Sequence, residues 1–155
     1  MDQPTNNVVL VVDDEPKIRR FLRAGFEMRD FKVLEAENAT TALRTATSNL
    51  PDLIILDLSL PDGSGYDVLE RIRAASNVPI IILSVVSSKE ETVRLLQAGA
   101  DDFVVKPFSM PELIARSEAA MRRHFKVPGT RSSLQAPSRS ILSAAGSNST
   151  TSRSR

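Results

Sequence analysis

The chain has 155 residues, of which 41% are hydrophobic and 25% are charged, the profile of a globular protein that can bury a core. The absence of cysteine excludes a disulfide framework, a thiolate zinc site and a cysteine nucleophile, and a single histidine excludes a metal site built from several histidines. Residues 1–125 hold 15 Lys and Arg against all 19 Asp and Glu, and this acidic balance does not favour a nucleic-acid-binding surface.

Short apolar runs alternate with helical patterns along residues 1–125. The runs are Val8–Val12, Phe31–Ala36, Leu53–Leu56, Ile80–Leu83 and Phe103–Val105. Most of them are continuously apolar, which is typical of strands buried on both faces of a parallel sheet.

Amphipathic stretches follow the five runs and predict five helices. Their apolar faces are formed by Ile18, Phe21, Leu22 and Gly25; by Ala39, Ala42, Leu43 and Ala46; by Val68, Leu69 and Ile72; by Val93 and Leu96; and by Leu113, Ile114, Ser117, Ala120 and Met121. Five such strand–helix units predict an α/β fold in which a parallel sheet is covered on both faces and its crossovers are right-handed. We expect the flavodoxin-like form of this fold, a doubly wound five-stranded parallel sheet with the strand order 2-1-3-4-5.

Residues 126–155 differ in composition from the rest of the chain. They hold nine Ser, three Thr and five basic residues, with no acid and few apolar residues. Such a segment cannot bury enough apolar area to offset its ordering entropy, so we expect a domain over residues 1–125 and a disordered, basic tail over 126–155, with no visible effector domain. The N-terminus is not signal-like, and no apolar run reaches the roughly 18–20 residues that span a bilayer, so a cytoplasmic protein without membrane contact is expected.

Polar residues stand where the predicted strands end. Asp13 and Asp14 follow the first strand, Asp57 the third, Ser84 the fourth and Lys106 the fifth. Open α/β sheets bind ligands at the carboxyl ends of their strands, and the predicted strand order places the first and third strands side by side. The three aspartates are therefore expected to meet in one cleft.

Three carboxylates in one cleft repel each other and require a cation, and a set of oxygen ligands favours Mg²⁺. Asp57 is then a candidate nucleophile that forms an acyl phosphate, with Lys106 and Ser84 contacting the phosphoryl oxygens. Taken singly, the aspartate pair can be a helix cap, Lys106 a solvated charge and Ser84 a partner for strand-end backbone. Their combination at one sheet edge favours the functional interpretation.

With these residues the sequence resembles the response-regulator receiver family over residues 8–124. The matching stretches are VVDDEP at 11–16, LDLSLPDGSG at 56–65, LS at 83–84 and GADDFVVKPF at 99–108. The resemblance implies two-component signalling, in which a sensor histidine kinase phosphorylates Asp57 and the domain is not a turnover enzyme. It also implies that Asp14, Asp57 and the Ser59 carbonyl bind Mg²⁺ directly, that Asp13 acts through water, and that the Lys106–Pro107 bond is cis.

The OmpR-type branch of the family, and especially its potassium-responsive Kdp regulators, is the most similar. The resemblance implies a homodimer through the fourth helix, fifth strand and fifth helix, and switching of that face. Its expected contacts are an apolar patch of Val93, Leu96 and Ala115, with Asp102–Arg116 and Asp101–Arg123 pairs across the interface. Ser84 and Phe103 are the implied switch residues, with Phe103 where the family usually has Tyr. Glu112 matches the branch too, but the position of its usual basic partner is occupied by Thr92, so one expected salt bridge is missing. DNA contact would require a winged-helix effector domain.

Three other functions are weighed against this one. A haloacid-dehalogenase-like phosphatase also uses a strand-end Asp, but needs a second Asp where this chain has Ser59. A flavodoxin-like cofactor binder needs a phosphate-binding loop after the first strand, where this chain has acidic DDEP. A pseudo-receiver that acts only as an interaction domain would not need the complete set of Asp13, Asp14, Asp57, Ser84 and Lys106.

Overall fold

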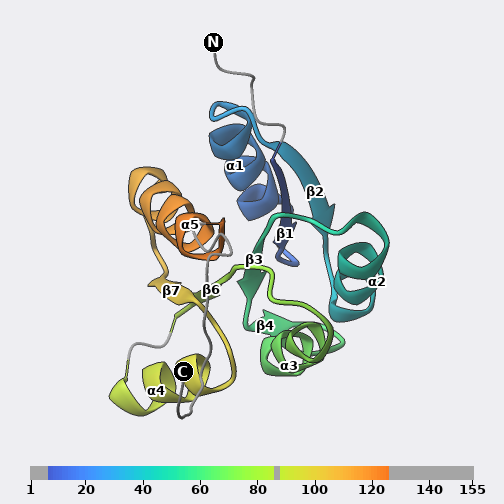
Figure 1. Cartoon of the computed structure of the whole chain (residues 1–155), viewed down its shortest axis with the longest axis vertical. Helices are drawn as coiled ribbons and strands as arrows, with labels where there is room; N and C mark the ends of the chain where they lie inside the picture. The colour runs from blue at the N-terminus through green and yellow to red at the C-terminus, as the bar shows by residue number, and fades with distance from the viewer. Residues whose placement is uncertain (1–6, 86–87, 126–155) are drawn as a thin grey trace, which may run out of the picture. The chain divides into compact units, whose positions relative to one another are not determined.

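The computed structural model of the chain describes residues 7–85 and 88–125 (Figure 1). Its elements are β1 (Val8–Val12), α1 (Pro16–Glu27), β2 (Lys32–Ala36), α2 (Ala39–Asn49), β3 (Leu53–Asp57), β4 (Ser59–Leu60), β5 (Gly63–Ser64), α3 (Gly65–Ala75), β6 (Ile80–Ser84), α4 (Lys89–Gln97), β7 (Asp102–Val105) and α5 (Met110–Phe125). The chain divides into two compact units, Met1–Met121 and Arg122–Arg155. Of the second unit, only residues 122–125 are described, and the predicted tail over 126–155 lies outside the described residues.

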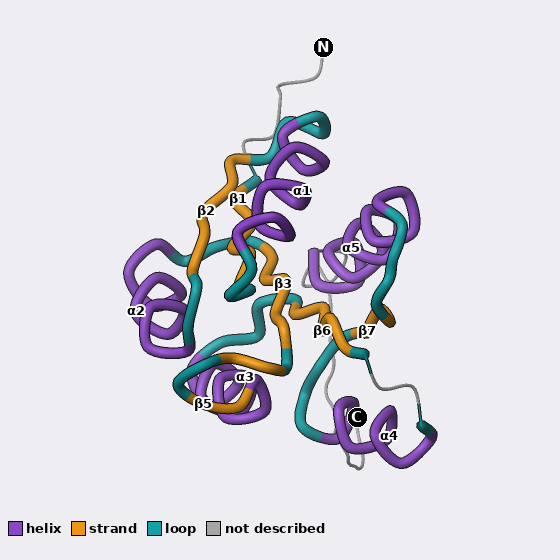
Figure 2. The backbone as a smooth tube through the Cα atoms, turned by 180° about the vertical axis from the view of Figure 1, so that it is seen from behind, coloured by secondary structure: helices purple, strands orange, loops and turns teal. Residues whose placement is uncertain are grey.

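Five strands form one parallel sheet in the order β2-β1-β3-β6-β7. This is the predicted order 2-1-3-4-5, because β4 and β5 belong to a separate small hairpin. Figures 1 and 2 show α1 and α5 on one face of the sheet, with α2, α3 and α4 on the other. The predicted α/β flavodoxin-like fold is therefore confirmed.

Two hydrophobic clusters lie on the two faces of the sheet. Alternate strand residues such as Val9 and Val11 pack with α1 and α5, whereas Leu10 and Val12 pack with α2, α3 and α4. All four of these side chains are fully buried. Burial on both faces explains why the strands are continuously apolar in sequence.

Local signals in the sequence define where the helices begin. Pro16 occupies the first turn of α1, where the missing N–H costs nothing. Asn38, Ser64 and Ser88 cap α2, α3 and α4, and each side chain accepts a backbone N–H from the first turn. No helix among residues 7–85 and 88–125 is long and apolar enough to cross a membrane.

The faces predicted for α1 and α4 need correction. In α1 the fully buried residues are Leu22 and Phe26, whereas Phe21 is 48% exposed. In α4 the buried residue is Leu95, and Val93 and Leu96 lie mostly outside the core. Apolar spacing alone does not say which of two neighbouring apolar residues points inward, because that depends on how the helix is rotated against the sheet.

The hairpin of β4 and β5 was not predicted. Ser59 pairs with Ser64 and Leu60 with Gly63 immediately after Asp57. Gly65 then starts α3 in close contact with the end of β3, since a Cβ there would lie 2.6 Å from the Asp57 carbonyl oxygen. The hairpin fixes the backbone of the loop that follows Asp57.

Candidate functional site

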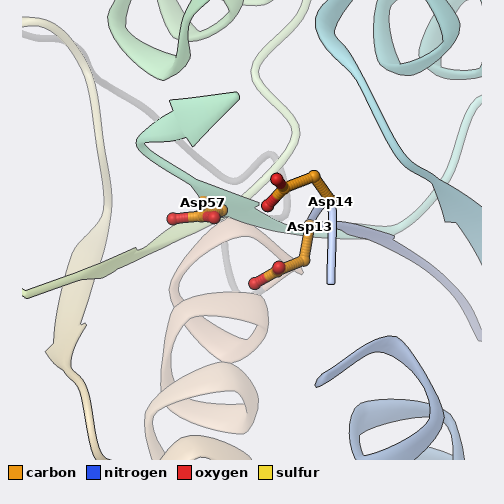
Figure 3. A group of neighbouring side chains, drawn as sticks. All are labelled: Asp13, Asp14 and Asp57. Atoms are coloured by element: carbon orange, nitrogen blue, oxygen red, sulfur yellow. The ribbon is translucent and has the colours of Figure 1, made fainter. Parts of the chain in front are cut away.

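Three aspartates converge where β1 and β3 end side by side (Figure 3). One carboxylate oxygen of each of Asp13, Asp14 and Asp57 lies within 4.8 Å of the others. Asp13 is fully buried and Asp57 is 5% exposed, whereas Asp14 is exposed. The predicted meeting of the three carboxylates is found, and it joins residues 44 positions apart because the parallel pairing aligns the two strand ends.

Lys106 approaches the aspartates from the end of β7. Its Nζ lies 3.3 Å from Asp13 Oδ2 and 3.6 Å from Asp57 Oδ1. The Lys106 backbone N–H donates to the Ser84 carbonyl at 2.8 Å, which ties the ends of β6 and β7 together. The Lys106–Pro107 peptide bond is cis, as expected from the resemblance.

Burial and charge act in opposite directions on the two central groups. The pKa of Asp57 is raised, first by burial and then by the charge of Asp13, although Lys106 opposes this rise. For Lys106, burial lowers the pKa, but the carboxylates of Asp57 and Asp13 outweigh burial and raise it. The site therefore holds an ammonium group beside a carboxylate whose negative charge is unfavourable.

The backbone around the aspartates is held by hydrogen bonds that sequence reasoning missed. Asp13 Oδ1 accepts the Glu15 N–H at 2.9 Å, and Asp57 Oδ1 accepts the Ser59 N–H at 3.3 Å. Arg19 donates to the Asp13 carbonyl at 2.7 Å and also to the Glu35 carboxylate at 2.9 Å. An Arg on the polar face of an amphipathic helix gives no sequence signal of such a contact.

A cavity of about 360 Å³ opens beside these groups. Its lining includes five predicted site residues, Asp14, Asp57, Ser59, Ser84 and Lys106. Tyr66 from α3 and Glu91 from α4 also line it, and neither was predicted. Their positions follow from the packing of α3 and α4 beside the ends of β3 and β6, which no local motif encodes.

Most residues predicted for the dimer face and the switch lie on α4, β7 and α5, whereas Asp101 directly precedes β7 and Ser84 ends β6. Val93, Leu96, Ala115 and Arg116 are exposed, as is Arg123 in the last described turn of α5. Asp102 accepts two hydrogen bonds from Arg116 of its own chain, and Asp101 pairs with Arg73 at 2.7 Å. Phe103 is half-buried against the cluster shared with α3 and α4.

The flavodoxin-like fold, with three aspartates and a lysine at the carboxyl edge of its sheet, is typical of receiver domains. The family model described as "Response regulator receiver domain" matches residues 9–118, and the chain belongs to this family. It is therefore a receiver domain of the kind found in two-component response regulators.

Several of the proteins that are similar to this chain are named as transcriptional regulators. The "Transcriptional regulatory protein KdpE" of Mycobacterium tuberculosis is 48% identical over 117 residues, which cover 76% of this chain and 52% of the relative. The KdpE of Escherichia coli is 48% identical over 116 residues, covering 75% and 52%. Among solved structures, the receiver domain of the Francisella response regulator 1452 has a TM-score of 0.73 and 36% identity, covering 77% of this chain and 99% of that one.

These findings confirm the resemblance seen in the sequence. The chain is similar to OmpR-type regulators, including those named KdpE, and it spans about half the length of these curated relatives. Receiver domains of this family bind Mg²⁺ through acidic residues, and the cluster of Asp13, Asp14 and Asp57 provides such residues here.

Proposed function

We propose that Asp57 accepts a phosphoryl group from a sensor histidine kinase. The observation that carries the proposal is the placement of a buried carboxylate at the end of β3, with Lys106 Nζ 3.6 Å away and a cavity beside it. An Asp57 carboxylate oxygen attacks phosphorus, a P–O bond forms, and the bond from phosphorus to the donor histidine nitrogen breaks. The nitrogen keeps the electron pair, so no oxidant or further reactant is needed.

The acidic residues fit a divalent cation with oxygen ligands. Asp13, Asp14 and Asp57 lie close together, and burial, followed by the charge of Asp13, raises the pKa of Asp57. A cation bound there would offset this unfavourable negative charge. We assign direct Mg²⁺ contacts to Asp14, Asp57 and the Ser59 carbonyl, and a contact through water to Asp13. When bound, Mg²⁺ would neutralise charge on the incoming phosphoryl group.

In this proposal, Lys106 and Ser84 contact the phosphoryl oxygens. Lys106 supplies a fixed positive charge, and Ser84, which is 3% exposed at the end of β6, supplies a hydroxyl donor. The same residues allow phosphorylation and dephosphorylation to be catalysed by the domain itself. The group that is phosphorylated and dephosphorylated is then a side chain of the domain itself, so the domain does not turn over a separate substrate.

A phosphodonor protein can approach beside Lys106, where a second cavity has an apolar wall. Its lining includes Phe21 from α1 together with Val85 and Phe108, and Phe21 and Val85 are exposed. Exposed apolar residues around a reactive site are typical of a surface that binds another protein. This is where we place the sensor histidine kinase.

Phosphorylation is proposed to act on the face of α4, β7 and α5. A phosphoryl group adds a charge of about −2 near Ser84. Movement of Ser84 toward the phosphoryl group would leave space into which Phe103 could turn. This rotation would change the face of α4, β7 and α5, and two copies of the chain would then pair through that face. Any DNA contact would be made by an effector domain fused to the receiver. We infer that the receiver domain spans residues 1–125 and that these residues suffice for phosphorylation of Asp57.

The acceptor is tested by intact-mass measurement after incubation with Mg²⁺ and acetyl phosphate. We expect the parent to gain one acid-labile phosphoryl group and Asp57→Ala to gain none. Asp67→Ala, which removes an exposed acid in the first turn of α3, is the matched control and should be labelled like the parent. Equal labelling of Asp57→Ala, or labelling that does not need Mg²⁺, would contradict the proposal.

A further inference from the structure

Tyr66 joins the first turns of α3 and α4 through two side-chain contacts. Its hydroxyl donates a hydrogen bond to the Glu91 carboxylate. The Arg94 guanidinium carbon lies 4.1 Å from the centroid of the Tyr66 ring, a cation–π contact from the same helix as Glu91. Tyr66 and Glu91 are both half-buried, so their positions are constrained by these contacts as well as by the backbone.

The Tyr66–Glu91 pair forms part of the wall of the cavity beside Asp57. Besides Glu91, the acidic residues that line this cavity are Asp14, Glu15 and Asp57, whereas Lys106 is the basic residue among the described lining residues. The carboxylate of Glu91 thus adds negative charge to a cavity that is already acidic. Neither Tyr66 nor Glu91 has a role in the phosphoryl transfer proposed above.

We propose that Tyr66 and Glu91 determine donor selectivity, because Tyr66 holds the Glu91 carboxylate at the cavity wall, where its charge disfavours small anionic phosphodonors. The proposal rests on the proposed function of Asp57. Glu91 is the selectivity residue and Tyr66 a positioning residue that acts through it.

The physical basis is repulsion between like charges in a partly enclosed space. A small donor such as acetyl phosphate brings its full negative charge into the cavity without any protein to offset the charge of Glu91. An approaching protein donor can bring basic groups of its own. Removing the Glu91 charge should therefore speed reaction with the small donor, and salt should diminish the gain.

The matched pair of variants is Glu91→Gln and Glu90→Gln. Both remove one negative charge from the first turn of α4, but Glu90 is exposed and does not line the cavity. At low salt we expect Glu91→Gln to raise the initial rate of labelling by acetyl phosphate about two- to fivefold, the effect of one partly screened charge. Glu90→Gln should stay near the parent rate. The gain should shrink as salt is added, whereas a gain that came only from loosening α4 would not depend on salt in this way.

Tyr66→Phe tests the positioning role. It keeps the ring under Arg94 and removes the hydroxyl that holds Glu91. We expect a smaller acceleration than in Glu91→Gln, because the Glu91 carboxylate remains but is free to leave the wall. In the double variant of Tyr66→Phe and Glu91→Gln, the rate should equal that of Glu91→Gln, since a positioning residue has no effect without the group it positions.

Tyr66 also provides a readout that does not depend on labelling, because it is the one tyrosine of a chain without tryptophan. Burial and the hydrogen bond to Glu91 raise its pKa to about 12. At about pH 10.5 the phenol should be largely neutral in the parent and clearly more ionised in Glu91→Gln, as measured by phenolate absorbance with the fold checked by circular dichroism.

The outcomes separate this inference from the proposed function. If the parent is labelled at Asp57 but Glu91→Gln is no faster than Glu90→Gln, the selectivity role is wrong and the acceptor role stands. If the phenolate absorbance of the parent and Glu91→Gln is the same, the Tyr66–Glu91 contact is absent in solution and the inference is overturned. A parent that is not labelled at Asp57 overturns both.

Discussion

Asp57 occupies a position in which its negative charge is disfavoured. It is almost fully buried, lies beside the buried carboxylate of Asp13, and is only partly compensated by Lys106. Burial and like charge both favour the protonated form of a carboxyl group. The arrangement suits a residue whose charge is to be balanced by a cation and a phosphoryl group, and it lowers the stability of the domain without them.

Asp57→Asn should therefore stabilise the domain in the presence of a metal chelator. A carboxyl group whose pKa is raised by folding contributes stability below its unfolded pKa, and loses it as the pH rises through the folded pKa. At neutral pH the charged Asp57 opposes folding, so we expect Asn to raise the free energy of unfolding by about 1 kcal/mol. Denaturant titration should show the gain at about pH 7 and its disappearance at about pH 3, below the ordinary carboxyl range. A loss of stability at neutral pH would contradict this account.

Ser117 is a second residue whose polarity opposes folding. Its side chain is fully buried on α5, and its hydroxyl has no hydrogen-bond partner among the described residues. An unsatisfied buried hydroxyl costs free energy, and Ala is also the better helix former. We expect Ser117→Ala to raise the free energy of unfolding by about 1 kcal/mol, measured by chemical denaturation. Ser109→Ala is a contrasting variant on an exposed position, and it should destabilise because the Ser109 hydroxyl accepts the Glu112 N–H.

At the scale of elements, the loop after Asp57 is connected to the start of α2. Asp62 lies between β4 and β5, and its carboxylate accepts the backbone N–H groups of Ala39 and Thr40 at 2.7 and 3.1 Å. Asn38 accepts the next free N–H, from Thr41, at 2.8 Å. The first turn of α2 is thus capped partly by a residue 23 positions away, and the cap holds the hairpin that begins at Ser59.

Asp62→Ala should weaken this connection and lower the thermal midpoint by a few degrees. The pKa of Asp62 is lowered, first by the Ala39 N–H, so its contribution is present at neutral pH and lost as the pH falls through the lowered pKa. The difference in midpoint between parent and variant should shrink in acid. Glu70→Ala, at an exposed acid on α3, is the control and should change the midpoint little. A difference that persists at low pH would show that the cap does not depend on the charge of Asp62.

At the scale of the whole molecule, the proposed dimer face has the composition of a self-complementary surface. Val93 and Leu96 are 51% and 48% exposed, and the other residues predicted for this face include the charged Asp102 and Arg116. Within one chain Arg116 already contacts Asp102 and Glu112, and Asp101 contacts Arg73. In a dimer, these side chains must either leave their partners in the same chain or contact both partners at once. Each ion pair between the two copies therefore contributes less to the free energy of dimerisation.

We expect a weak two-fold dimer that strengthens when a beryllofluoride phosphate mimic is bound, measured by sedimentation with Mg²⁺. Arg116→Glu places like charge against Asp102 of the partner copy and should prevent the strengthening. Arg20→Glu, an exposed basic residue on α1, is the matched charge reversal away from this face and should dimerise like the parent. A parent that stays monomeric with and without the mimic would exclude this output and favour binding of a different protein.

The sequence by itself determined the parallel sheet, with helices on both faces, and the residues at its carboxyl edge. Continuous apolar strands require cover on both faces, right-handed crossovers then restrict the topology, and polar residues after each strand must gather at one edge. Asp13, Asp14, Asp57 and Lys106 were therefore predictable, since their proximity follows from parallel pairing in register.

Only the tertiary structure decided which helix residues point inward and which side chains complete the cavity. Leu95 rather than Val93 or Leu96 is buried, because the rotation of α4 is set by its contact with the sheet. Tyr66 meets Glu91 because α3 and α4 lie on the same face of the sheet and begin near the ends of β3 and β6. Periodicity fixes the spacing of residues along one helix, but contacts between helices depend on distances and rotations that arise when the layers pack.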